Sequence, residues 1–195
     1  MTQDLMALLP QWGPWLLAAS AFLSCMMVPV PTSALLLTAG ALSGTGHLHL
    51  PWLVLAAFAG ASVGDVAAFS LARRLGPWLN RAGTKRAQLM ERAQDFIARR
   101  GLLAVFLSRW LITPLGPAIN YVAGAAGMAL PRFAIASFAG ELLWAVIHLG
   151  IGHLVGRNFR NDEGAALKAL AVGLVLAGLL FATRAIWRRT RRGTI

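Results

Sequence analysis

Three long apolar runs constrain the fold more than any other feature of this sequence. They cover residues 50–72, 133–155 and 165–187, and each has about 20 mostly apolar residues, the length of α-helix that crosses ~30 Å of hydrocarbon. Backbone polar groups in hydrocarbon must be paired within their own segment, which favours helices. Hydrophobic residues make up 57% of the chain. The sequence therefore predicts an all-α integral membrane protein with one membrane domain over residues 1–195.

A fourth apolar segment, residues 101–130, is interrupted by Pro114, Gly116 and Pro117. Proline lacks a backbone donor and clashes with the preceding turn, so no straight helix can run through this interruption. The segment must bend there.

Basic residues indicate which way this segment bends. Eight Lys and Arg side chains lie between residues 73 and 100, and four arginines lie in the tail 188–195. The positive-inside rule places both groups in the cytoplasm. A full crossing by 101–130 would put the tail outside, so we predict a re-entrant hairpin and a cytoplasmic C-terminus. The net charge of +11 is thus read as a topology signal, and we expect no nucleic-acid partner.

Residues 12–42 show the same design, with Pro29 and Pro31 between two apolar arms. The chain has no Lys or Arg before Arg73, which suits an outside N-terminus and argues against a cleaved signal peptide. We predict a first re-entrant hairpin that enters from the opposite face. The alternative is one kinked spanning helix with its N-terminus inside.

The two halves of the chain resemble each other. At an offset of 80 residues, Gly60 matches Gly140 and Gly76 matches Gly156, and the returning arms share Ala-Gly-Ala at 39–41 and 123–125. Each repeat consists of a hairpin, a loop, a proline and a spanning helix, in opposite orientations. Inverted repeats with broken helices are typical of membrane transporters.

Residues 77–100 connect the repeats. Leu89, Ala93, Phe96 and Ile97 are spaced so as to share one helical face. This pattern predicts a cytoplasmic interfacial helix near anionic headgroups. A solvated linker is the alternative.

Three charged residues lie inside apolar segments, where a charge near the midplane costs at least ~2.5 kcal/mol and usually has a partner. Asp65, Arg109 and Glu141 each lie about eight or nine residues from the same membrane face, or roughly 12 to 14 Å at the helical rise. We therefore expect one cluster near the second proline break.

Arg109 can bind an anionic headgroup, because its planar fork holds two phosphate oxygens. The alternative is a structural ion pair with Asp65 or Glu141, and each carboxylate is a candidate proton acceptor or counter-ion. His148 and His153 are read as a proton relay or as packed side chains. Further candidates for the transport path are Thr113, Pro114, Gly116, Asn120 and Tyr121 in the second hairpin and Pro29, Pro31 and Ser33 in the first.

At this point the sequence resembles the DedA family, also called SNARE-associated or VTT-domain proteins, over residues 22–157. The resemblance rests on the order of Pro29-Val30-Pro31, Ala39-Gly40, Gly60-Ala61-Ser62-Val63-Gly64-Asp65 with Phe69, Arg73-Arg74-Leu75-Gly76, Phe106-Leu107-Ser108-Arg109-Trp110 with Pro114, Ala123-Gly124, and Gly140 with Trp144, Gly150, Gly152 and Gly156. It implies a multi-pass protein of the bacterial inner membrane. It also implies lipid transfer between leaflets, with undecaprenyl phosphate or phospholipid as substrate, although some members are tied to proton-dependent transport.

The chain departs from the family pattern at two places. Family members usually have acidic residues where this chain has Ser24 and Ser33, and many have a second arginine where it has Leu115-Gly116-Pro117. Because the usual acidic residues are absent, Asp65 and Glu141 are the intramembrane acids that could serve in proton coupling.

We therefore expect a DedA-type lipid transporter without enzymatic activity, cofactor or bound metal. The alternatives are a proton-coupled transporter of a small anion or solute and a non-transporting membrane scaffold. Cys25 is the one cysteine, so no intramolecular disulfide forms. Spacings such as Gly60/Gly64 and Gly152/Gly156 permit close helix packing, either within one chain or in a homo-oligomer.

Overall fold

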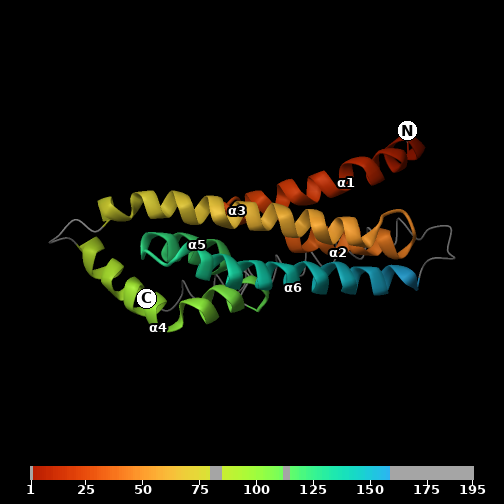
Figure 1. Ribbon diagram of the computed structural model, residues 1–195. Coiled ribbons are helices and arrows are strands. Elements are labelled where there is room, and N and C mark those ends of the chain that lie inside the picture. Colours follow the sequence, from red (N-terminus) through yellow and green to blue (C-terminus); the bar gives the residue numbers. More distant parts are fainter. Residues whose placement is uncertain (1, 80–84, 112–114, 159–195) are drawn as a thin grey trace, which may run out of the picture. The chain divides into compact units, whose positions relative to one another are not determined.

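A computed structural model describes residues 2–79, 85–111 and 115–158, and these ranges are helical without any strand (Figure 1). The predicted all-α class is thereby confirmed. The predicted helix 165–187 and the tail 188–195 lie outside the described residues. The helices are α1 (Thr2–Cys25), α2 (Thr32–Gly44), α3 (Leu50–Leu79), α4 (Lys85–Trp110), α5 (Gly116–Ala125) and α6 (Leu130–Arg157).

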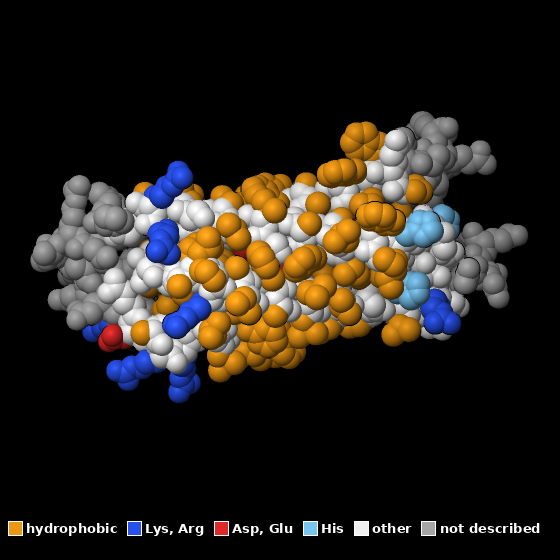
Figure 2. Space-filling view, viewed as in Figure 1, with side chains coloured by type: hydrophobic (Ala, Val, Ile, Leu, Met, Phe, Trp, Pro, Cys, Tyr) orange, Lys and Arg blue, Asp and Glu red, His pale blue; other side chains and the backbone are white. Residues whose placement is uncertain are grey.

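Two of these helices are long and apolar enough to cross a membrane, namely Leu50–Gly76 of α3 and the whole of α6. Pro51 and Pro131 lie in their first turns, where proline's missing donor costs nothing. Their outward faces expose large hydrophobic side chains, such as Trp52 on α3 and Ile135 on α6. Figure 2 shows hydrophobic side chains over much of the visible surface. A surface of this kind suits contact with lipid.

The first predicted break is present. Helix α1 ends at Cys25 and α2 begins at Thr32. Between them, Met27 has a φ of 67°, and the Val28 N–H donates to the Leu23 carbonyl at 3.0 Å. The helical run therefore stops before the two prolines, as their missing donors require. The re-entrant path of residues 12–42 stays a prediction.

The second break follows α4. This helix runs through residue 100, where the sequence placed a boundary between an interfacial helix and a hairpin arm. Residues 85–100 are mostly good helix formers without proline or glycine, so propensity continues the helix across the change in polarity. Helix α5 begins at Gly116 with Pro117 in its first turn, and it packs against α4.

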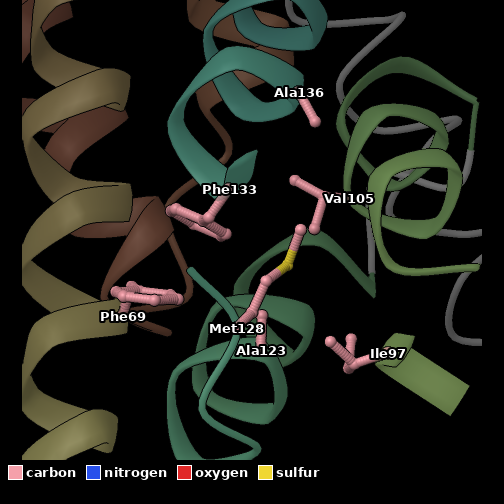
Figure 3. Close-up of a cluster of buried hydrophobic side chains, with 7 residues drawn as sticks. All are labelled: Phe69, Ile97, Val105, Ala123, Met128, Phe133 and Ala136. Carbon is pink, nitrogen blue, oxygen red and sulfur yellow. The ribbon is translucent and has the colours of Figure 1, made fainter. Parts of the chain in front are cut away.

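The described residues form two compact units. The first comprises residues 2–13, 31–53 and 147–158, and the second comprises 14–30 and 54–146 with its gaps. In the second unit, α3 to α6 contribute to one hydrophobic cluster (Figure 3). The rings of Phe69 and Phe133 stack there with centroids 4.4 Å apart. The cluster consists of Phe69, Ile97, Val105, Ala123, Met128, Phe133 and Ala136.

Glycines allow close helix contacts in both units. In the second unit, a Cβ on Gly124 of α5 would lie 2.2 Å from the Phe69 carbonyl oxygen of α3. In the first, a Cβ on Gly40 of α2 would lie 2.3 Å from the Leu149 carbonyl oxygen of α6. Phe69 and Leu149 are equivalent at the predicted offset of 80 residues, and the two glycines are the matching glycines of Ala-Gly-Ala at 39–41 and 123–125.

A second pair of contacts obeys the same relation. A Cβ on Gly76 would lie 3.0 Å from the Ala125 carbonyl oxygen, and a Cβ on Gly156 would lie 2.1 Å from that of Ala41. Helix α2 of the first predicted repeat thus packs on α6 of the second, and α5 of the second packs on α3 of the first. Several identities of the sequence repeat are therefore helix-packing positions.

Candidate functional site

Arg109 lies in the last turn of α4, with a relative exposure of only 2%. Its guanidinium carbon is 5.7 Å from the centroid of the Phe133 ring. A Cβ on Gly140 of α6 would lie 2.6 Å from the Arg109 Cγ. The glycine therefore creates the space in which the arginine stem is buried.

Two carboxylates from different helices face this arginine. Its Nη2 is 3.3 Å from Asp65 Oδ2 of α3, and its Nε is 3.5 Å from Glu141 Oε1 of α6. Its Nη1 donates to the Gly116 carbonyl at 3.1 Å. The structure thus brings together the three charged residues that were expected to form a cluster, next to the second helix break.

Asn120 of α5 links the arginine to the aspartate. Its Oδ1 accepts a hydrogen bond from Arg109 Nη2, while its Nδ2 donates to Asp65 Oδ1 at 2.7 Å. Nδ2 also lies 3.5 Å from the Cys25 carbonyl at the end of α1. The amide therefore links the end of α1 to Asp65 and Arg109.

Ser137 of α6 was not singled out from the sequence. Its hydroxyl donates to Asp65 Oδ2. Ser137 lies one helical turn before Glu141, and residues four apart share a helix face. This four-residue spacing is the feature of the sequence that could have identified Ser137. We call Asp65, Arg109, Asn120, Ser137 and Glu141 the Arg109 cluster.

The charges of the Arg109 cluster do not balance when both acids are ionised. One guanidinium faces two carboxylates, and all three side chains are buried. An uncompensated buried charge is strongly unfavourable. Uptake of one proton by the carboxylates would make the cluster neutral.

The same region contains a potential metal-ligand set. Ligand atoms of Cys25, Asp65 and Glu141 lie within 4.8 Å of one another. The Arg109 guanidinium already pairs with both carboxylates and would repel a second cation. This arrangement favours an internal ion pair over a metal site.

The structure does not add every predicted residue to the cluster. Pro29 is exposed in the second unit, whereas Pro31 precedes α2 and Ser33 is half-buried within it, both in the first unit. Thr113 and Pro114 lie outside the described residues.

The remaining candidates lie on α5 and α6. Tyr121 of α5 and His148 of α6 are half-buried. His153 Nδ1 is 2.8 Å from the Ser43 Oγ of α2, within the first unit. That hydrogen bond favours a packed His153 over a proton relay.

Replacing Ser137 with alanine should lower the free energy of unfolding by about 1 to 3 kcal/mol, because a buried carboxylate loses a donor. Ser108→Ala is the matched control. Ser108 is also buried, but its hydroxyl donates to the Val105 carbonyl of its own helix. Unfolding of both variants in detergent would measure the difference, and equal losses would contradict a special role for Ser137.

A comparison with protein families decides what kind of chain this is. The model of the VTT domain matches residues 30–154, a range that contains the whole Arg109 cluster. The chain belongs to the VTT domain family. This finding confirms the resemblance to DedA proteins.

Individual relatives agree with this assignment. The VTT protein is 29% identical to an uncharacterized membrane protein of Synechocystis sp., with 83% of this chain and 78% of the relative aligned. It is 25% identical to inner membrane protein YqjA of Escherichia coli K12, covering 82% and 76%. It is 22% identical to an alkaline phosphatase-like protein of Lactococcus lactis subsp. lactis, covering 93% and 88%. No solved structure matches the chain.

The family and the two long apolar helices together identify a membrane protein. Among the residues whose burial is described, the Arg109 cluster is the most polar buried region, since it combines three charged residues with two polar ones. Such groups inside a membrane protein usually belong to a transport path or a proton relay.

Proposed function

We propose that this VTT protein moves phosphate-bearing lipids between the leaflets of a bacterial inner membrane. Its two hairpins would be re-entrant from opposite faces, and its C-terminus would be cytoplasmic. The main supporting observation is Arg109, which is buried and paired with two carboxylates next to a broken helix. The substrate class would be undecaprenyl phosphate or phospholipid.

In this proposal the observed arrangement is the closed state. Every terminal nitrogen of Arg109 has an internal partner, namely Gly116, Asn120 or Asp65. A phosphate group offers oxygens in the geometry that the guanidinium fork prefers. On opening, the headgroup would replace the carboxylates as the partner of Arg109, while the acyl chains stay in the bilayer.

When Arg109 turns to the headgroup, the two carboxylates lose their positively charged partner. Binding of a proton would then reduce their negative charge. Asp65 keeps the donors of Asn120 and Ser137 when Arg109 turns to the headgroup. Glu141 is paired with the Arg109 Nε at 3.5 Å, and this nitrogen makes no hydrogen bond within the described residues. Glu141 is therefore the carboxylate that would take up the proton.

A second candidate function is proton-coupled transport of a small anion or solute. The charge balance favours it, because the cluster gains neutrality by binding one proton. In that case the Arg109 fork would bind a free anion instead of a headgroup.

Lipid exchange in proteoliposomes tests the proposal. Fluorescent phospholipid and undecaprenyl phosphate would be followed between leaflets with folded protein, at two pH values. We expect faster exchange of at least one phosphate-bearing lipid than in protein-free liposomes. No acceleration of any lipid would reject the proposal, and uptake of solute driven by a pH gradient would then favour the second candidate.

A further inference from the structure

An open pocket lies in the second unit, outside the Arg109 cluster. Its volume is about 520 Å³, and its walls come from α4, the loop after α5 and the start of α6. Three arginines line it, Arg99, Arg100 and Arg132, together with apolar residues that include Leu102 and Leu103. Among the lining residues, none is acidic.

The sequence of α4 indicates at which level of the membrane this pocket lies. Before Gly101 the helix exposes the charged side chains of Arg92, Asp95, Arg99 and Arg100, with Phe96 among them, and after it the helix exposes Leu102 and Leu103. A change from exposed charges to exposed leucines marks the border between headgroups and hydrocarbon. The pocket thus offers cations on its polar side and an apolar surface on its other side.

The loop after α5 forms part of the pocket wall. Gly127 has a φ of 79°, and no atom lies within 4 Å of the position of a Cβ there. Arg73 of α3 donates a hydrogen bond to the Met128 carbonyl at 2.8 Å, which fixes the loop. A positive φ favours glycine, so the loop conformation is encoded by the sequence.

A neighbouring pocket adds further arginines to this positively charged region of the second unit. It has a volume of about 640 Å³, shares Ala129 with the first pocket, and is lined by Arg73 and Arg74. Figure 2 shows Lys and Arg side chains gathered along one border of the hydrophobic surface. Clusters of arginines at this depth attract anionic lipids, at about 1 kcal/mol per cation.

We propose that the 520 Å³ pocket binds the headgroup of an anionic glycerophospholipid as a resident lipid. The phosphate would contact Arg99, Arg100 and Arg132, and an acyl chain would lie along Leu102 and Leu103. This lipid differs from a transported one, because the pocket does not include the Arg109 cluster. The proposal therefore holds whichever substrate the protein moves.

Thermal unfolding in a neutral detergent tests this site. Phosphatidylglycerol should raise the unfolding temperature of the wild type more than phosphatidylcholine does. In the variants Arg99→Gln and Arg132→Gln, half of the stabilisation should require about fivefold more phosphatidylglycerol, and roughly 25-fold more in the double variant. The control Arg92→Gln removes an exposed charge of α4 that does not line the pocket, and it should respond as the wild type does.

Three results would overturn the proposal. One is equal stabilisation of the wild type by both lipids, and another is an unchanged phosphatidylglycerol response in both single variants. The third is equal stabilisation by glycerol phosphate, which has the phosphate but no acyl chain, because the ligand would then be a soluble anion. Each single variant keeps the other arginines, so the test does not depend on the double variant folding.

Discussion

Replacing Arg109 with lysine should slow leaflet exchange of phosphate-bearing lipid by about ten- to a hundredfold. Lysine keeps the positive charge but lacks the planar fork that holds two oxygens. Loss of one charge-assisted hydrogen bond costs ~1.5 to 3 kcal/mol, and each ~1.4 kcal/mol corresponds to a factor of ten in rate. Exchange in proteoliposomes, with equal amounts of folded variant and wild type, measures the effect.

Arg157→Lys is the matched control, because Arg157 is exposed at the end of α6. Its exchange rate should equal that of the wild type. Cys25 supplies an independent readout, since it is the one cysteine and is buried beside the Arg109 cluster. If the cluster opens during transport, a thiol reagent should label Cys25 faster when lipid substrate is present. Unchanged exchange in Arg109→Lys would exclude the fork as the headgroup contact and favour a scaffold role.

Much of this fold could be predicted from the sequence, because the bilayer leaves few choices. The apolar length of α3 and α6 and the prolines that end helices act locally, so their effects are visible without a structure. The cluster of Asp65, Arg109 and Glu141 was predictable for a related reason. Each charge lies at a similar depth in its apolar segment, and an unpaired charge at that depth is costly.

Contacts that depend on tertiary packing were harder to predict from the sequence. Ser137 is one of several small polar residues in apolar helices, and only its partner on α3 reveals its role. The extent of α4 also differed from the expected boundary. The sequence changes polarity at Gly101, but helix propensity and packing against α5 carry the helix on to Trp110.

Gly152→Ala should destabilise the first unit, whereas Gly150→Ala on the same helix should not. A Cβ at position 152 would lie 2.2 Å from the Leu37 carbonyl oxygen of α2, and nothing lies within 4 Å of a Cβ at position 150. A backbone atom cannot rotate away, so α2 and α6 must separate.

Forced separation of packed helices typically costs ~1 to 3 kcal/mol, whereas alanine's higher helix propensity returns at most ~1 kcal/mol. We therefore expect a lower unfolding temperature for Gly152→Ala and an unchanged or slightly higher one for Gly150→Ala. Thermal unfolding of both variants in the same detergent would show the difference. Equal unfolding temperatures would contradict the close contact between α2 and α6. They would also remove the structural reason for the matching glycines at positions 40 and 124, because these glycines permit the same kind of contact in the two repeats.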